Sequence, residues 1–256
     1  IKHLSDDEYT NSHNLIFATK NGIVKKTRLK EYSHINANGK KAIKILEGDE
    51  VIQVRLTNGD TEIILADREG RAIRFHESKV REVGRDSIGV RGMTLGSEND
   101  VVIGMITMTG AENESVMVVS ENGYGKRSAL EDYRITNRGG KGVKTLSITE
   151  KTGQLVAIKN VTDNNDLMII NQSGITLRLP VDSIRIMGRA TQGVKLIDLG
   201  KRGDTIASVC KVDSDPETEI EEESEETITG TSSEIIENEI NENAVTDHSM
   251  DVESEI

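Results

Sequence analysis

The sequence predicts an all-β protein of the β-propeller, or pinwheel, type, built from four-stranded blades of about 50 residues each. Two recurring features lead to this fold class, and both are glycines. The first glycine follows a short apolar run in each repeat, at Gly22, Gly70, Gly123 and Gly174, with spacings of 48, 53 and 51 residues. The second glycine comes later in each repeat, at Gly39, Gly89, Gly142 and Gly193.

Each repeat contains four candidate strands in a fixed order. The first strand is the apolar run before the first glycine, and Asn21-Gly22 and Asn122-Gly123 favour a two-residue hairpin turn after it, because that turn needs positive φ at both positions. The second strand follows the turn. The second glycine opens a third apolar segment, such as Val143–Leu146, and a fourth follows, such as Leu155–Ile158. We expect one repeat to form one blade; the alternative is a single β-sandwich in which the glycine spacing is accidental.

The repeats define the expected domain boundaries. A propeller domain is expected over residues 1–212, with blade repeats near 15–60, 61–113, 114–164 and 165–212. Residues 1–14 are expected to be the last strand of a preceding blade and a loop. Because the sequence opens with Ile1 rather than Met, we expect a fragment whose propeller is truncated on its N-terminal side.

The charge of the chain divides sharply near its end. All 32 Lys and Arg residues lie at or before Lys211, and the residues from Asp213 onward hold 17 of the 44 Asp and Glu. The body therefore carries 27 acids against 32 bases, a formal charge of +5, while the tail carries −17. Residues 213–256 lack aromatic residues and cannot bury enough apolar area to offset chain entropy, so a disordered acidic tail is predicted.

Basic residues form columns when the repeats are aligned. The first column lies four residues after each first glycine and holds Lys26, Arg74, Arg127 and Arg178. The second lies two residues after each second glycine and holds Lys41, Arg91, Lys144 and Lys195. The third lies four residues before each second glycine and holds Ile35, Arg85, Arg138 and Arg189.

Such columns predict a binding surface for duplex DNA. Blades repeat by rotation, so one basic residue per blade becomes a ring of charge, and the ring would contact the regularly spaced phosphates of a bent duplex. Aromatic residues are 2% of the chain and Trp is absent, which disfavours a single-strand binder that stacks bases. The alternative is a solvated outer strand with scattered Lys and Arg.

Several motifs resemble the C-terminal domain of the bacterial DNA gyrase A protein. They are LIFATKNGIVKKTRLKE at 15–31, GVRGMTLG at 89–96, ENGYGKR at 121–127, GKGVKTL at 140–146 and GRATQGV at 188–194. The resemblance covers roughly residues 1–210 and implies a six-bladed pinwheel that wraps duplex DNA for ATP-dependent negative supercoiling by other domains. It also implies assembly with the rest of gyrase A and with gyrase B as A2B2, and a cytoplasmic location. The related domain of topoisomerase IV is the close alternative.

The family's signature heptapeptide, Gln-Arg-Arg-Gly-Gly-Lys-Gly, has no intact copy here. Residues 138–142 match its last five positions, in the third repeat, and this match adds Lys141 to the candidate DNA-binding residues. Either the blade that carries the intact box lies outside this sequence, which we favour, or the box has moved.

No catalytic or cofactor site is predicted for this fragment. The five His residues lack ligand spacing, the single Cys210 makes a zinc site or an internal disulfide implausible, and no phosphate-binding loop is present. ATP and Mg²⁺ are expected on other parts of the parent enzyme, which the resemblance makes a type II topoisomerase. Packing roles are expected for the four tyrosines, Tyr9, Tyr32, Tyr124 and Tyr133.

Two other classes of function remain open at this point. A protein-binding propeller scaffold would normally carry aromatic signatures in each blade, and a propeller hydrolase would need convergent carboxylates or His residues at its hub. Neither feature is found in the sequence. No apolar run approaches the length of a membrane helix, so no membrane contact is predicted.

Overall fold

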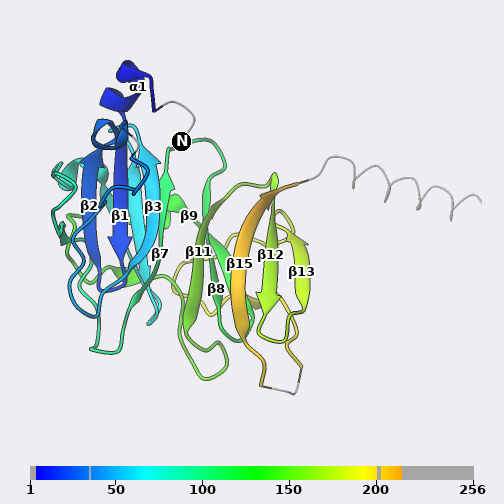
Figure 1. Cartoon of the computed structure of the whole chain (residues 1–256). Helices are drawn as coiled ribbons and strands as arrows, with labels where there is room; N and C mark the ends of the chain where they lie inside the picture. Colours follow the sequence, from blue (N-terminus) through cyan, green and yellow to red (C-terminus); the bar gives the residue numbers. More distant parts are fainter. Residues whose placement is uncertain (1–3, 35, 201–202, 215–256) are drawn as a thin grey trace, which may run out of the picture. The chain divides into compact units, whose positions relative to one another are not determined.

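The computed structural model describes residues 4–34, 36–200 and 203–214 (Figure 1). Its strands form four antiparallel sheets, and the all-β propeller class predicted from the sequence is confirmed. The first sheet has the order β3 (Val51–Thr57), β1 (Asn14–Thr19), β2 (Ile23–Arg28), β6 (Val90–Arg91). The second has the order β7 (Val102–Met108), β4 (Glu62–Asp67), β5 (Arg71–His76), β10 (Val143–Lys144).

The third sheet has the order β11 (Leu155–Val161), β8 (Ser115–Ser120), β9 (Tyr124–Ala129), β14 (Val194–Lys195). The fourth has the order β15 (Ile206–Asp213), β12 (Asn165–Asn171), β13 (Thr176–Pro180). Short 3₁₀ turns follow the second strand of the first three repeats: η1 (Leu29–Tyr32), η2 (Glu77–Lys79), η3 (Leu130–Asp132).

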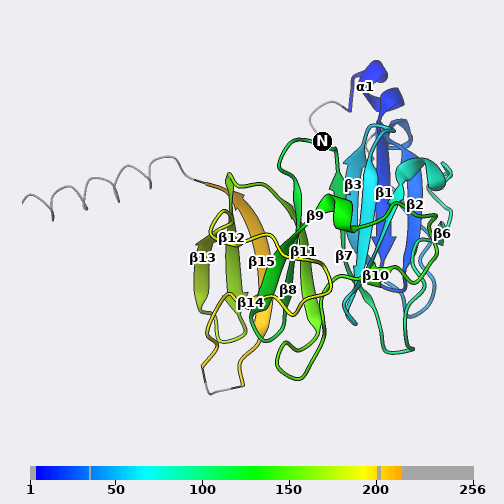
Figure 2. The ribbon, with the colours of Figure 1, turned by 180° about the vertical axis from the view of Figure 1, so that it is seen from behind.

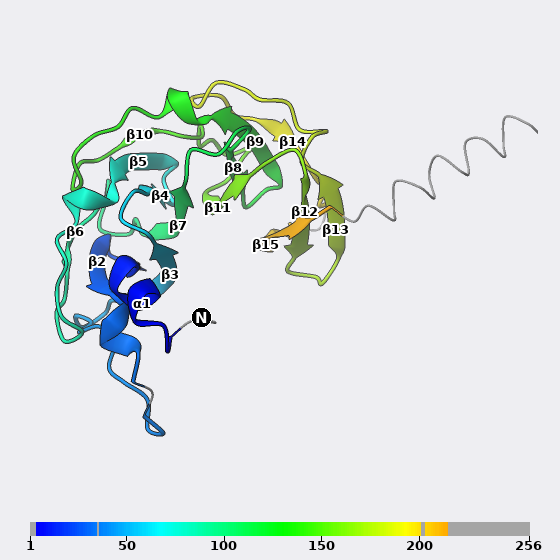
Figure 3. The ribbon, with the colours of Figure 1, turned by 90° about the horizontal axis from the view of Figure 1, so that it is seen from above.

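One repeat does not form one blade, which corrects the expectation from the sequence. The third segment of each later repeat leaves its own blade and pairs with the hairpin of the preceding one, as β6 of the second repeat pairs with β2 of the first. The second glycine permits this exchange: a Cβ on Gly89 would lie 2.5 Å from the Val24 carbonyl oxygen, and the residue has a φ of +108°. Donated strands β6, β10 and β14 therefore form the outer edge, and β3, β7, β11 and β15 the inner edge (Figure 3).

The apolar core lies between neighbouring blades. Ile63 and Leu65 on one face of β4 pack with Ile16 and Val24 of the first blade, whereas Ile64 on the other face packs with the third blade. A blade between two others is therefore buried on both faces, which explains why the first strand of each repeat is a continuous apolar run rather than an alternating one. A third cluster joins the third and fourth blades in the same way.

The prediction of a preceding strand within residues 1–14 is wrong for the described part of that segment. Residues Asp7–Ser12 form helix α1, which Figure 2 shows beyond one end of the strands of the first blade. The side chain of Asp6 accepts a hydrogen bond from the Tyr9 amide at 3.0 Å, and Asp7 and Glu8 lie in the first turn. This N-cap and the favourable helix dipole stabilise a short helix that the hydrophobic pattern did not indicate.

Asp67 is a fully buried carboxylic acid at a hairpin turn. Its Oδ1 accepts a hydrogen bond from the Arg71 amide at 2.7 Å, and Asn171 plays the same part in the fourth repeat, where its Oδ1 accepts from Ile175 at 2.6 Å. Burial raises the pKa of Asp67 to about 7, and the nearby Asp100 adds to the rise. Because the folded state holds this proton up to pH 7 and the unfolded state releases it near pH 4, the stability contributed by the group falls as the pH rises between these values.

We expect Asp67→Asn to be more stable than the parent chain at pH 8, since the amide keeps the turn hydrogen bond without a buried charge. The difference in free energy of unfolding between the variant and the parent grows between about pH 4 and pH 7, by at most roughly 1.4 kcal/mol per pH unit, and is constant above pH 7. Urea unfolding at about pH 5.5 and at pH 8 measures it. An equal difference at the two pH values would contradict the assignment.

Candidate nucleic-acid interface

The first basic column lies inside the protein rather than on its rim. Lys26 and Arg127 are 7% and 3% exposed, and the guanidinium of Arg74 is almost as well covered. Each of these side chains contacts the next repeat at its 3₁₀ turn or, in the fourth repeat, at the loop in the same position. The Lys26 ammonium donates to the Glu77 carbonyl at 3.3 Å, and Arg74 Nη1 donates to the Leu130 and Tyr133 carbonyls at 2.7 and 2.9 Å.

Carboxylates complete the pairing of this column. Arg127 forms an ion pair with Asp163 at 2.7 Å and donates to the Val181 carbonyl at 3.0 Å, and Arg74 is paired with Glu62. The prediction that this column faces DNA is therefore not supported by its position, because the cations are already satisfied between blades. Arg178 follows the pattern only in part: it pairs with Asp166 at 2.6 Å and stays 40% exposed.

The second column is exposed in all four repeats. Its members belong to the donated outer strands or, for Lys41, to the matching loop of the first repeat. Lys41 and Lys195 form surface ion pairs with Asp86 and Asp198, at 3.4 and 2.7 Å. For Arg91 and Lys144, no ion pair links the side chain to a carboxylate within the described chain, so both cations are available to an anion.

The third column lies directly beside the second, across a blade boundary. Arg138 donates through Nη1 to the Arg91 carbonyl at 3.0 Å, and Arg189 donates through Nη1 to the Lys144 carbonyl at 2.9 Å. Arg85 contacts the Lys41 carbonyl in the same way at 3.2 Å. The first-repeat position, Ile35, lies outside the described residues.

Each contact brings an arginine side chain to the backbone of a second cationic residue at a blade boundary, and this arrangement occurs three times in the described chain. The arginines of the second and third pairs also donate through Nε to a 3₁₀-turn region, at the Lys79 and Asp132 carbonyls, at 2.8 and 3.0 Å. One edge of the guanidinium is thus fixed on the backbone. An arginine can donate to the backbone through one edge of its guanidinium and still offer its other N–H groups to a phosphate, whereas the charge of a lysine is confined to one ammonium group. These three pairs, Lys41 with Arg85, Arg91 with Arg138 and Lys144 with Arg189, are called the rim pairs below.

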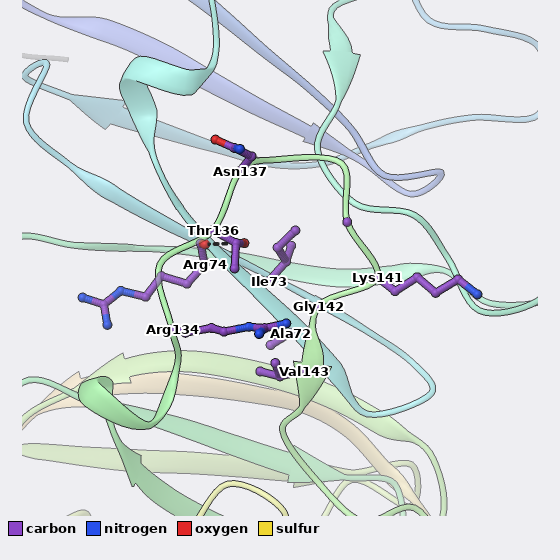
Figure 4. A pocket seen from close by; sticks show the side chains of 10 residues that line it. Ala72, Ile73, Arg74, Arg134, Thr136, Asn137, Lys141, Gly142 and Val143 are labelled. Carbon is purple, nitrogen blue, oxygen red and sulfur yellow. Dashed lines mark hydrogen bonds between the residues drawn. The ribbon is translucent and has the colours of Figure 1, made fainter.

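The box-like segment of the third repeat borders a shallow hollow of about 310 Å³. The hollow is lined by Ile73, Arg134, Thr136, Asn137 and Gly140, among others (Figure 4). Lys141 also lines the hollow, and its exposed side chain extends outward from it (Figure 4), so its charge lies at the mouth of the hollow.

Two buried lysines that the sequence columns missed hold loops of their own or of the next repeat. Lys25 donates to the Ala42 and Arg85 carbonyls at 2.5 and 2.6 Å, and Lys126 donates to the Gly188 carbonyl at 2.5 Å. Burial lowers the pKa of both amines to about 8. The sequence does mark these two lysines. The first and third repeats carry a Lys within the apolar pattern, three residues after the first glycine, where the second and fourth repeats carry Ile73 and Leu177.

No cluster of three or more His, Cys, Asp or Glu side chains is arranged to hold a metal ion in the part of the chain that the structure describes. Among the same residues, no helix has the length and apolar character needed to cross a membrane. Tyr133 is 1% exposed and lies within the core between blades, with its hydroxyl 2.5 Å from that of Thr145.

Exchanged outer strands and a cation-rich outer edge define the chain as a β-propeller of the pinwheel type. The sequence profile of the DNA gyrase C-terminal domain β-propeller matches residues 13–58, 63–107, 114–162 and 165–211. The chain belongs to this family.

Individual relatives agree with the family. The DNA gyrase A protein of Staphylococcus aureus (strain NCTC 8325 / PS 47) is 47% identical over 215 residues, which are 84% of this chain and 24% of the relative. The chain thus spans about a quarter of the length of the curated relatives it matches.

Solved structures are similar as well. A crystal structure of the C-terminal domain of DNA topoisomerase IV superposes with a TM-score of 0.74 at 28% identity, over 79% of this chain and 62% of the other. A structure of a DNA gyrase A C-terminal domain gives a TM-score of 0.70 at 25% identity, over 79% and 66%.

Proposed function

We propose that this chain binds duplex DNA without sequence preference and wraps it, as a module of a type IIA topoisomerase. The observation that carries the proposal is the recurrence of the rim pairs at successive blade boundaries. Paired cations at repeated intervals match a partner whose negative charge also repeats, and duplex DNA carries about one charge per 1.7 Å of axis. Membership of the gyrase C-terminal domain family supports the same partner.

The rim pairs suit phosphate recognition rather than base readout. They lie on the outer strands β6 and β10 and in nearby loops, and single cations that recur from blade to blade supply phosphate contacts rather than the base-specific hydrogen bonds of a helix or two-stranded ribbon in the major groove. Contacts of this kind hold the backbone and bend it, and the cost of bending is offset by the additional phosphates reached. We propose gyrase as the parent enzyme, with its cleavage, ATP and Mg²⁺ sites on other domains, gyrase B as partner in an A2B2 assembly, and a cytoplasmic location.

We expect the chain to change the linking number of a closed plasmid. Relaxed plasmid is incubated with increasing amounts of protein, treated with a type I topoisomerase, deproteinised and run on a gel. Wrapping traps writhe, so the topoisomer distribution shifts in proportion to the bound protein. Binding in a gel-shift assay with an unshifted distribution would retain DNA binding and reject wrapping.

DNA affinity is expected to fall steeply with salt and to vary little with sequence. If the six residues of the rim pairs each contact a phosphate, the slope of log K against log salt is about −5, because each contact releases about 0.9 counterion. Fluorescence anisotropy with two unrelated duplexes measures both properties. A slope near zero would reject the phosphate-rim model.

The acidic tail lies outside the described residues apart from Asp213 and Ser214, and its predicted disorder stays a prediction. We propose that its charge of −17 competes with DNA for the rim, since tethering gives it an effective concentration in the millimolar range. Removing residues 214–256 is then expected to tighten DNA binding at low salt, and the gain should shrink as salt screens both partners. Identical isotherms for the two chains at low salt would assign the tail another role.

A further inference from the structure

Lys126 is a fully buried lysine whose ammonium lies beside the loop of a rim arginine. The residue is 0% exposed, and its Nζ donates to the Gly188 carbonyl at 2.5 Å. Gly188 directly precedes Arg189, so the accepting oxygen belongs to the peptide group that joins these two residues. The lysine belongs to strand β9 of the third repeat and the loop to the fourth, so the contact crosses a blade boundary.

The same contact occurs at the boundary between the first and second blades. Lys25 of strand β2 is also 0% exposed, and its Nζ donates to the Arg85 carbonyl at 2.6 Å. Arg85 is the rim arginine of that boundary, as Arg189 is of the boundary between the third and fourth blades. In both places a buried ammonium holds a peptide group next to the Cα of a rim arginine.

Packing alone does not require a lysine at this position. The corresponding residues of the second and fourth repeats are Ile73 and Leu177, so an aliphatic side chain is compatible with the fold there. Burial of an ammonium group costs free energy and lowers the pKa of both lysines to about 8. The amines are still mostly protonated at pH 7, where their hydrogen bonds to carbonyls are assisted by charge. An aliphatic residue cannot make this contact with the loop.

The boundary between the second and third blades holds its loop by other means. The Gly139 amide donates to the Gly92 carbonyl at 2.6 Å, and the Gly139 carbonyl accepts from the Thr94 hydroxyl at 2.7 Å. Gly139 directly follows Arg138, the rim arginine of this boundary. Backbone and hydroxyl groups thus fix this loop without a lysine, and Arg138 provides an internal comparison for the other two boundaries.

Arg189 is held at both ends when the buried lysine is in place. Its guanidinium donates through Nε to the Asp132 carbonyl at 3.0 Å and through Nη1 to the Lys144 carbonyl at 2.9 Å. On the backbone side, the Gly188 carbonyl accepts from the lysine and also from the Thr191 amide at 3.2 Å, which closes a turn. The remaining N–H groups of the guanidinium therefore keep one direction, which lowers the entropy lost when they bind a phosphate.

We propose that Lys126 is a positioning residue for DNA binding, which holds the loop of Arg189 so that the guanidinium offers its remaining N–H groups to a phosphate. Lys25 has the same role for Arg85. The role depends on the proposed binding of duplex DNA. Because both lysines are buried, they act on affinity through their arginines, and the contribution of each lysine disappears when its arginine is removed.

Amide hydrogen exchange of the whole chain without DNA tests the hold on the loop. Lys126→Met keeps a side chain of similar length and removes the donor and the charge, and Lys126→Leu introduces the residue type of Leu177. The Thr191 amide, which donates to Gly188, is expected to exchange at least about tenfold faster in either variant, whereas the Gly139 amide keeps its rate. Unchanged exchange at Thr191, or equal acceleration at both amides, overturns the proposal.

A double-mutant cycle measured by fluorescence anisotropy tests the effect on DNA. At low salt, Arg189→Met is expected to weaken duplex binding about five- to tenfold, and Lys126→Met about threefold or more. The double variant is expected to bind as Arg189→Met alone does, within about twofold, because the lysine has no arginine left to position. In the control cycle, Lys126→Met and Arg138→Met act at different boundaries, and their effects are expected to multiply.

The two cycles separate failure of this role from failure of DNA binding. Effects that multiply in both cycles show that Lys126 contributes charge or stability by itself, and they overturn the proposal while duplex binding stands. A parent chain that does not bind duplex DNA rejects the proposed function together with the positioning role. The cycle of Lys25→Met with Arg85→Met is expected to match that of Lys126 with Arg189, and multiplying effects there overturn the role of Lys25.

Discussion

Reversing the charge of Lys41, Arg91 and Lys144 together is expected to weaken duplex binding by about a hundredfold or more at low salt and to reduce the salt slope by about 3. All three are exposed members of the rim pairs, Arg91 and Lys144 on the donated outer strands β6 and β10 and Lys41 on the matching loop of the first repeat. The loss has two sources, because three phosphate contacts disappear and three carboxylates then repel the duplex. Anisotropy titrations at several salt concentrations measure affinity and slope in one experiment.

The matched control changes three cations of the opposite edge. Arg55, Lys159 and Lys211 lie on the inner strands β3, β11 and β15, and reversing them alters the net charge by the same amount. Arg55 and Lys159 are partly buried, so circular dichroism first verifies that the control variant is folded. The folded variant is expected to retain most of its affinity, since only the long-range field at the outer edge changes. Equal losses from the two triple variants would show that DNA responds to net charge alone and that no particular edge is the interface.

Replacing Arg127 with Met is expected to lower the free energy of unfolding by about 3 to 5 kcal/mol. The substitution removes a buried cation and leaves buried acceptors without a donor, among them the Val181 carbonyl and the Ser115 hydroxyl. Asp163 loses its partner as well, although it is half exposed and can be hydrated. Urea unfolding followed by circular dichroism measures the change.

Arg178→Met provides the control within the same column. Arg178 has the same offset from its glycine and also pairs with an aspartate, but it is 40% exposed and no carbonyl of a following blade is seen to accept from it in the described chain. Its loss is expected to cost about 1 to 2 kcal/mol, less than the loss of Arg127, because buried Asp166 loses this ion pair but no carbonyl between blades loses a donor. Similar destabilisation by the two substitutions would contradict the view that this column stabilises contacts between blades.

The fold class and the repeat could be predicted from the sequence because they depend on local rules. Glycines such as Gly22 mark tight hairpins, where φ is +82°, and continuous apolar runs mark strands covered on both faces. Helix α1 was not predicted, because its stability comes from the Asp6 cap and not from a hydrophobic pattern.

The charge columns show where reasoning from the sequence alone ends. Arg127 and Lys144 both stand at positions that are basic in every repeat, and alignment ranks them equally as contacts for DNA. The first is 3% exposed and the second is exposed at the outer edge. The two residues differ in exposure because one face of a strand packs against the next blade and the other does not. Which face packs depends on contacts between residues about 50 positions apart in the sequence.

What the sequence by itself determined is the presence of four similar β units, the positions of their turns, and the separation of a basic body from an acidic tail. Tertiary structure alone decided that outer strands are exchanged between repeats, as Val143 pairs with Ala72, and that exchange decides which cations are exposed. The physical reason is that a two-residue strand has no pairing preference of its own. Two tertiary contacts determine its partner. A carbonyl of the preceding hairpin lies close to the second glycine, and the residues that follow, such as Leu146, are buried in the core between blades.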